Sequence, residues 1–205
     1  MRFANALTLL LDIVAPPRLT ERSVRTLSHE QLMNILSHDE RGLLPYREEV
    51  VRALVWELKY HANAKAAALA GEMLSQELLG IAGDELGMPL LIPVPMHAAR
   101  RRERGYKQTE LLCEAALEKL TGAVFEYIPH AIERIRSTPM QQGLPKHVRL
   151  KNVKDSMHVT NPAAVLGRVC VVVDDVSTTG ATLTEAARAL RVAGARRVHS
   201  VALAY

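Results

Sequence analysis

The part of the sequence best suited to chemistry follows an apolar run at residues 169–173. Two carboxylates, Asp174 and Asp175, come first, and residues 176–182 then supply hydroxyl side chains and Gly180. Backbone amides in such a loop, with the positive end of a following helix, form a cradle for an anion, and glycine lets the backbone approach it closely. Hydroxyl groups add further donors to phosphate oxygens. The segment therefore predicts a binding site for a phosphate group.

The paired carboxylates narrow the kind of phosphate compound that fits. They would repel a bare polyphosphate, but they suit the neighbouring 2- and 3-hydroxyls of a ribose as hydrogen-bond acceptors. They could also offset positive charge that develops on a sugar ring during loss of a leaving group. Asp174 and Asp175 are therefore the candidate catalytic residues. The whole candidate phosphoribose site is Asp174, Asp175, Val176, Ser177, Thr178, Thr179, Gly180, Ala181 and Thr182.

Competing interpretations of this segment have less support in the sequence. Neither G-x-x-x-x-G-K-[ST] nor G-x-G-x-x-G occurs, so a nucleoside triphosphatase loop and a dinucleotide fold have no support. A response-regulator receiver also places acids after a strand, but after its first strand, whereas this pair lies near the end of the sequence. A purely structural alternative is that Asp174 caps a helix and the threonines close a turn, although a cap needs one such residue and not six.

The elements around the site indicate an α/β fold. Residues 169–173 are apolar without alternation, as in a strand buried on both faces of a parallel sheet. Residues 182–193 have the period of a helix, and residues 198–203 form a second apolar run. Strand, helix and strand in this order are a βαβ unit. We therefore expect a mostly parallel central sheet with helices on both faces.

The helix expected at residues 182–193 has an apolar inner face and a charged outer face. We expect Glu185, Arg188 and Arg191 to face solvent. Gly194 stands where a glycine commonly ends a helix.

The sequence upstream predicts further helices and strands. Helices are expected at residues 46–58, 64–79 and 108–120, strands at 90–95 and 124–128, and a turn-prone connection at 80–89. We assign residues 45–205 to one domain and residues 1–44 to a small helical appendage. Within the appendage, a helix at residues 3–14 ends before two prolines, and residues 20–37 show no strong core face.

The composition fits a globular protein with an aliphatic core. Hydrophobic residues make up 48% and charged residues 23% of the chain, and the formal net charge is +4. A basic excess of this size suits an anionic small molecule as well as a nucleic acid. Cys113 and Cys170 lie far apart among apolar neighbours, so we expect core thiols in a reducing compartment. Because no segment is typical of a leader or a membrane span, we expect a cytoplasmic location.

Five separated segments carry a resemblance to a known family. They are Leu58-Lys59-Tyr60, Ile92-Pro93-Val94-Pro95, the run from Arg102 to Gln108, Arg136-x-Thr138-x-x-Gln141 ahead of Arg149-x-x-Asn152, and the acidic loop with its strand at residues 171–182. In order and spacing they resemble the competence protein F (ComF) family over residues 45–205. The resemblance implies a type I phosphoribosyltransferase-like fold. It also implies phosphoribosyl pyrophosphate as ligand, with magnesium carried by that ligand and no metal bound directly by the chain.

The resemblance implies a second half of the site, on the pyrophosphate side. Its contacts would be Pro95, Met96, Arg100 and Arg104, in the loop after the strand at residues 90–95. Arginine suits this task because its planar fork can donate two hydrogen bonds to phosphate oxygens, and Arg104 is the best single candidate. The alternatives for these arginines are a solvated helix start or a nucleic-acid contact.

A mobile hood is also implied, at residues 136–152. Lys146 and Arg149 would reach the leaving group from it when the hood closes over the substrate. A disordered linker is the alternative for such an irregular stretch. From the residues alone, Lys59 is more typical of a surface or packing lysine than of a ligand, and His97 is given no role.

Two features depart from the family pattern. Leu19 follows the segment from Leu10 to Arg18 where the first cysteine of an N-terminal zinc ribbon is usual, so contacts made by a ribbon are not expected. Lys107 stands between Tyr106 and Gln108 where the family typically has asparagine, which adds positive charge near the pyrophosphate side.

Three functions remain open on the sequence. The first is a transferase that moves phosphoribose to an unknown nucleophile and releases pyrophosphate. The second is a non-catalytic nucleotide-binding accessory protein in DNA uptake, and the third is direct binding of single-stranded DNA by the arginines of residues 100–104. The expected partners are phosphoribosyl pyrophosphate or a nucleotide, with single-stranded DNA or the DNA-uptake machinery as further candidates, a homodimer as one assembly, and no membrane.

Overall fold

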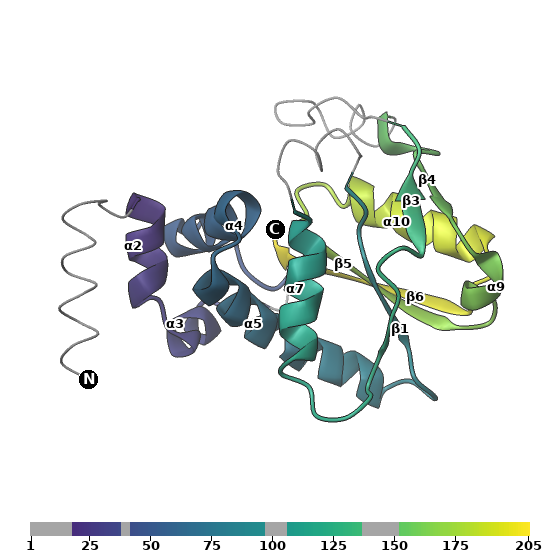
Figure 1. Ribbon diagram of the computed structural model, residues 1–205, viewed down its shortest axis with the longest axis horizontal. Helices are drawn as coiled ribbons and strands as arrows, with labels where there is room; N and C mark the ends of the chain where they lie inside the picture. The colour runs from purple at the N-terminus through teal and green to yellow at the C-terminus, as the bar shows by residue number, and fades with distance from the viewer. Residues whose placement is uncertain (1–17, 38–41, 97–105, 137–151) are drawn as a thin grey trace.

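The computed structural model describes residues 18–37, 42–96, 106–136 and 152–205 (Figure 1). Four helices come first: α2 (Leu19–Thr26), α3 (His29–Asn34), α4 (Glu49–His61) and α5 (Ala64–Gly83). The middle of the chain forms β1 (Leu90–Pro93), α7 (Gln108–Leu117), β2 (Glu126–Tyr127), β3 (Ile132–Arg134) and β4 (Met157–Val159). The last elements are α9 (Pro162–Val165), β5 (Val169–Val176), α10 (Ala181–Val192) and β6 (Arg197–Ala204).

The central sheet is parallel throughout, in the order β2-β1-β5-β6. Strand β5 lies in its middle, with Pro93 of β1 opposite Val173 on one side and Ala202 of β6 opposite Asp174 on the other. The chain leaves β1 through α7 towards β2, and leaves β5 through α10 towards β6. The mostly parallel α/β fold expected from the sequence is confirmed.

Both faces of this sheet are buried, by different helices. Figure 1 shows α5 and α7 on one side of the sheet and α10 on the other. Alternate strand residues enter the two cores: Leu91, Val171, Val173, Val201 and Leu203 join the core with α4, α5 and α7, and Leu90, Ile92, Cys170, Val172 and Ala202 join the core with α10, β3 and β4. Burial on both sides explains why the strand sequence shows no apolar–polar alternation.

Helices α5 and α7 pack very closely at one point. A Cβ atom at Gly71 would lie 2.5 Å from the carbonyl carbon of Ala115, so glycine is needed for this approach. The contact fixes α7 against α5, and α7 begins beside the end of β1. The packing of the helical layer therefore helps to fix where α7 begins beside Val94.

Strand β5 is longer than the sequence predicted. The expected end at residue 173 is wrong, because the ladder with β6 continues until Val176 lies opposite Ala204. Aspartate is a poor strand former, which is why the apolar pattern predicted an end before Asp174. Both carboxylates are thus held on regular strand backbone, and the loop proper starts at Ser177.

The N-terminal stretch is also better packed than expected. The prediction that residues 20–37 have no strong core face is wrong, because Val24, Leu27 and Leu32 are buried in the same core as α4 and α5. Leu44 then forms a parallel bridge with Ala204, beside the end of β6. The helix expected at residues 3–14 lies outside the described residues.

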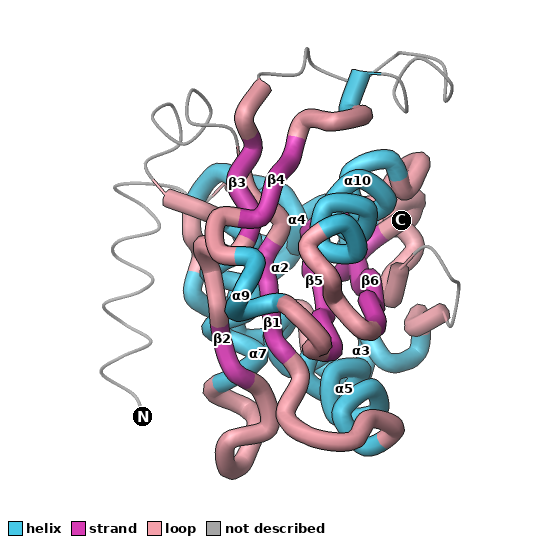
Figure 2. The backbone as a smooth tube through the Cα atoms, turned by 90° about the vertical axis from the view of Figure 1, so that its right-hand side faces the viewer, coloured by secondary structure: helices cyan, strands magenta, loops and turns pink. Residues whose placement is uncertain are grey.

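A small second sheet was not predicted from the sequence. Strands β3 and β4 pair antiparallel, with Ile132 opposite Val159 and Arg134 opposite Met157. Figure 2 shows this hairpin as a unit above the central sheet. Three residues per strand are too few to show a period, so the sequence could not reveal it. The hairpin flanks residues 137–151, the main part of the expected hood, which lie outside the described residues.

Candidate functional site

The carboxyl ends of β1 and β5 form the topological switch point of the sheet. These two strands are neighbours, but their following helices, α7 and α10, lie on opposite faces and lead to opposite edges. Ligands of open α/β sheets bind at such a point, outside the carboxyl ends of the strands. The candidate residues after each strand, Pro95 and Met96 on one side and residues 174–182 on the other, meet there.

The acidic pair is buried and has few partners. Asp174 is 8% exposed and Asp175 is 5% exposed. The backbone N–H of Asp175 donates to Oδ1 of Asp174 at 2.9 Å. Oδ2 of Asp175 is buried and accepts no hydrogen bond among the described residues, although it forms an ion pair with Lys59 Nζ at 3.3 Å. A buried acceptor of this kind is suited to a ligand hydroxyl.

Burial and the neighbouring charge change the proton affinity of Asp174. Desolvation, followed by repulsion from Asp175, raises the pKa of Asp174 from 3.8 to about 7. Attraction to Lys59, the hydrogen bond from the Asp175 amide and attraction to Arg134 oppose this shift without cancelling it. Strongly shifted carboxylates at a switch point are typical of functional sites.

Lys59 is the residue of this site that the sequence patterns did not predict. It lies near the end of α4, with 22% of its side chain exposed, and it reaches the carboxylate of Asp175 from the helical layer. Lys59 is therefore not a free surface lysine, because most of its side chain is buried in an ion pair with the acidic pair. Its motif with Leu58 and Tyr60 was the only signal for it, since nothing in helical periodicity reports a partner far away in sequence.

The loop after the acidic pair has the geometry expected of an anion site. The backbone N–H of Ser177 donates to the carbonyl of Ala204 at 2.8 Å, which ties the loop start to the end of β6. Gly180 is the N-cap of α10 with φ +72°, a conformation that favours glycine. Having no side chain, it leaves the first-turn amides of α10 without the side-chain acceptor that serine or aspartate would supply. Those amides are suited to a phosphate group.

The described part of the expected pyrophosphate side is held by α7. The N–H of Val94 donates to the carbonyl of Val173 at 2.8 Å, and the hydroxyl of Thr109 donates to the carbonyl of Val94 at 2.9 Å. Pro95 and Met96 follow directly and are partly exposed. The other predicted contacts, Arg100, Arg104, Lys146 and Arg149, lie outside the described residues.

Tyr106 connects this side of the site to α4. Its hydroxyl donates to the carbonyl of Leu58 at 3.1 Å and accepts from the N–H of Ala62 at 3.0 Å. Ala62 has φ 44° and ends α4, so the hydroxyl caps the end of the helix. The residues on either side of Lys59 are thereby fixed to the segment that precedes α7.

One charged residue of α10 does not face solvent as predicted. Glu185 is 4% exposed, and its carboxylate accepts two hydrogen bonds from Arg188 at 2.8 Å and one from the N–H of Met157 at 3.2 Å. The expectation of an outward Glu185 is wrong because β4 packs against α10 and covers this position. Arg188 also pairs with Asp155 at 3.4 Å, so the cluster joins the hairpin to the helix that follows the loop.

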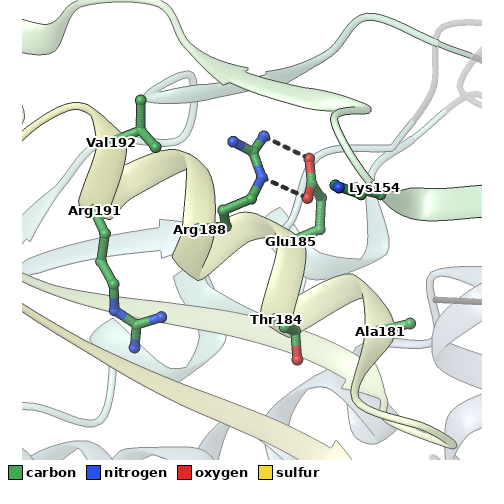
Figure 3. Close-up of a pocket in the computed structure, with 7 residues that line it drawn as sticks. All are labelled: Lys154, Ala181, Thr184, Glu185, Arg188, Arg191 and Val192. Carbon is green, nitrogen blue, oxygen red and sulfur yellow. Dashed lines mark hydrogen bonds and ion pairs between the residues drawn. The ribbon is translucent and has the colours of Figure 1, made fainter. Parts of the chain in front are cut away.

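A hollow of about 600 Å³ lies along the outer face of α10 (Figure 3). Its lining consists of Lys154, Ala181, Thr184, Glu185, Arg188, Arg191 and Val192. Figure 3 shows the Glu185–Arg188 pair on one side of it, near Lys154. Because Asp174 and Asp175 do not line it, this hollow is distinct from the acidic pair.

Neither a cluster of metal-binding side chains nor a membrane-spanning helix is found in the described ranges. Within those ranges, no cluster of three or more histidine, cysteine, aspartate or glutamate side chains is arranged to hold a metal ion. The helices of the same part of the chain include none with the length and apolarity needed to cross a membrane.

Comparison with known proteins agrees with this architecture. The family model "Phosphoribosyl transferase domain" matches residues 129–205. The chain is 35% identical over 148 residues to the DNA utilization protein YhgH of Salmonella typhi, covering 71% of this chain and 63% of that protein. It is 34% identical over 116 residues to Competence protein F of Haemophilus influenzae, covering 56% and 49%. The chain thus spans less than two thirds of the length of these relatives.

Among solved structures, the chain is similar to glutamine phosphoribosylpyrophosphate (PRPP) amidotransferase from B. subtilis complexed with ADP and GMP. The sequence identity is 19% and the TM-score is 0.41, with 73% of this chain and 30% of that chain covered. So distant a likeness supports no argument about function.

The parallel sheet, the acidic loop after β5 and the matching domain model define a protein of the phosphoribosyltransferase superfamily. Within that superfamily, the sequence is similar to YhgH and to Competence protein F. The chain belongs to the ComF family.

Proposed function

We propose that the switch-point site binds the 5-phosphoribosyl group of phosphoribosyl pyrophosphate or of a nucleotide. The single observation that carries the proposal is the acidic pair, which is buried beside the loop that leads into α10 and retains an acceptor oxygen without a hydrogen bond among the described residues. The 5-phosphate would lie against the amides at the start of α10 and the hydroxyls of residues 177–182. The ribose hydroxyls would donate to Asp174 and Asp175.

Magnesium would enter with the ligand. It would neutralise the pyrophosphate of phosphoribosyl pyrophosphate as that group leaves C1 of the ribose. The chain's own contribution is then to hold the ribose through Asp174 and Asp175 and the phosphate through the loop, and to supply negative charge near the ring as positive charge develops. In the transferase form of the proposal, an unknown nucleophile takes the phosphoribosyl group and pyrophosphate is released.

The ligand proposal is tested by calorimetry with phosphoribosyl pyrophosphate and magnesium. Each of Asp174→Asn and Asp175→Asn should weaken binding at least about tenfold, since a hydrogen bond to a charged group is worth about 1.5–3 kcal/mol. The matched control is Asp84→Asn, an exposed aspartate next to the end of α5, which should bind like the unmodified protein. Absence of heat from the unmodified protein, or unchanged affinity in both site variants, would overturn the proposal.

A transferase and a binding module make different predictions for pyrophosphate release. With magnesium, phosphoribosyl pyrophosphate and a panel of nucleobases and amines, a transferase releases pyrophosphate in a manner that depends on one acceptor and is lost in Asp175→Asn. A non-catalytic module binds the ligand with the same dependence on Asp174 and Asp175 but releases no pyrophosphate with any acceptor.

A role in the handling of DNA is the second candidate, and the names of the relatives favour it. YhgH is called a DNA utilization protein, and the other relative a competence protein. The arginines of residues 100–104, which could contact single-stranded DNA, lie outside the described residues. Neutralising these arginines should abolish affinity for a single-stranded oligonucleotide and flatten its salt dependence. An unchanged affinity and salt slope would remove direct DNA binding by this segment.

A further inference from the structure

Lys59 directly follows two anchored residues of α4. Two positions before it, Glu57 is fully buried and accepts hydrogen bonds from Thr20 at 2.7 Å, from Arg18 at 3.0 and 3.3 Å and from Asn63 at 3.2 Å. One position before it, the carbonyl of Leu58 accepts from Tyr106. The backbone of Lys59 is therefore fixed relative to α2, to the start of α5 and to the segment before α7.

The ammonium group of Lys59 forms an ion pair with one carboxylate of the two. Its Nζ lies 3.3 Å from Oδ2 of Asp175, whereas the carboxylate of Asp174 accepts from the backbone N–H of Asp175. Among the described residues, the charges that act on Asp174 are those of Asp175 from β5 itself, Lys59 from α4 and Arg134 from β3. Two buried carboxylates side by side cannot both ionise at neutral pH without a nearby cation.

We propose that Lys59 is the positioning residue of the acidic pair, which holds the carboxylate of Asp175 in place as the fixed acceptor for a ribose hydroxyl. The inference rests on the proposed function and deepens it, since it names the group that holds one of the two ribose-binding carboxylates in place. It follows from one contact at 3.3 Å between two largely buried side chains, with the lysine backbone fixed by the anchors at Glu57 and Leu58.

The loss of this cation has a specific consequence. Without Lys59, the two carboxylates would share one proton over a wider pH range, because Arg134 would be left to offset their repulsion. At moderately alkaline pH the unmodified protein would offer two ionised acceptors. A variant without Lys59 would offer one at the same pH. Affinity for a ribose ligand would fall at neutral pH and return as the pH rises.

The first test needs no ligand. The carboxyl groups are followed by carbon NMR during a pH titration of the unmodified protein, Lys59→Met, Lys59→Gln and Lys59→Arg. The two neutral variants should raise the midpoint of Asp174 by at least about one pH unit, as expected from loss of a charge within about 6 Å. Lys59→Arg should keep the midpoint, and Lys119→Met, which removes an exposed lysine after α7, should not move it.

The second test measures affinity for phosphoribosyl pyrophosphate with magnesium from pH 6 to 9. In Lys59→Met the affinity at pH 7 should fall about tenfold, and its half-maximal pH should move upward by about one unit, with Lys59→Arg restoring both. A merely structural lysine would change the affinity without moving the pH profile. Unmoved midpoints in folded Lys59→Met and Lys59→Gln overturn the inference. If the unmodified protein binds no ligand, the proposed function fails, but the NMR titration still decides the role of Lys59.

Discussion

Both ends of the central sheet carry acidic residues with largely buried side chains, but the acids at the two ends differ in their number of charged partners. At the amino ends of the strands, Glu85 accepts from Arg197 at 2.7 Å and contacts His199 at 2.8 Å, with Arg196 at 3.7 Å. At the carboxyl ends, Lys59 lies near Asp174 and Asp175 and forms an ion pair with Asp175 at 3.3 Å. The side chains are similarly buried at the two ends. The acid at the amino end has several charged partners, whereas the two acids at the carboxyl end have fewer.

The proton affinities follow this difference. Hydrogen bonds from His199 and Arg197 lower the pKa of Glu85. Burial opposes ionisation of Glu57 and of Glu185, but hydrogen bonds from arginine and other donors outweigh it, and the pKa of each carboxyl is lowered. Burial and Asp175 instead raise the pKa of Asp174 to about 7. Well-partnered acids hold elements together, whereas an acid left short of partners at a switch point is suited to a ligand.

The largest effect on stability is expected where a well-partnered acid is disturbed. Glu57→Gln keeps the shape of the side chain but removes the charge that Arg18 and Thr20 contact, so the free energy of unfolding should fall by about 2–3 kcal/mol. Urea unfolding measures it. Glu21→Gln, which alters an ion pair of the same Arg18 on the surface, should cost less than about 0.5 kcal/mol. Equal costs in the two variants would remove the distinction between buried and surface acids.

A rise in pH is expected to lower the stability that Asp174 contributes at the carboxyl end of the sheet. The folded protein binds the proton of Asp174 more tightly than the unfolded chain, whose aspartates titrate near 3.8. Stability from this group is therefore fully present below about pH 4, falls as the pH rises through about 7 and stays low above it. With about 1.4 kcal/mol for each pKa unit, and about two of the units lying between pH 5 and the midpoint near 7, the loss between pH 5 and pH 8 is on the order of 2–3 kcal/mol. Unfolding curves of the unmodified protein and of Asp174→Asn at pH 5 and pH 8 measure it. An unmodified protein that loses no stability relative to the variant over this interval would contradict the assignment.

The sequence predicts the local features of the fold and the site better than the features that depend on long-range contacts. The loop at residues 177–182 and the βαβ unit around it follow from local patterns, namely an apolar run, hydroxyl residues and a helical period. The contact between Lys59 and Asp175 does not, because it depends on how α4 is docked to the sheet. Burial of Glu185 likewise depends on the hairpin of β3 and β4, whose strands are too short to have a period.

Asp174→Asn should stabilise the ligand-free protein while it weakens ligand binding. The neutral amide relieves repulsion from Asp175 and removes the cost of a buried charge, so the free energy of unfolding at pH 8 should rise by about 1–2 kcal/mol. At pH 4.5 the unmodified carboxyl is already protonated in the folded protein, and the difference should largely vanish. Thermal unfolding at the two pH values measures the change. A variant that is less stable at pH 8 would mean that Asp174 has a structural role and is not kept for a ligand.

The smallest effect separates the loop of the site from an ordinary turn. Gly180→Ala places a Cβ atom 3.9 Å from Oγ1 of Thr184, which is normal contact, so its cost comes from the backbone at φ +72° and should be about 1 kcal/mol of stability. Gly122→Ala is matched, with φ +80° and open space around the new atom, and should cost about the same. Calorimetry with phosphoribosyl pyrophosphate and magnesium then distinguishes them: affinity should fall about tenfold only in Gly180→Ala, because a shifted backbone misplaces the amides at the start of α10. Equal affinities in the two variants would mean that the start of α10 does not contact the phosphate.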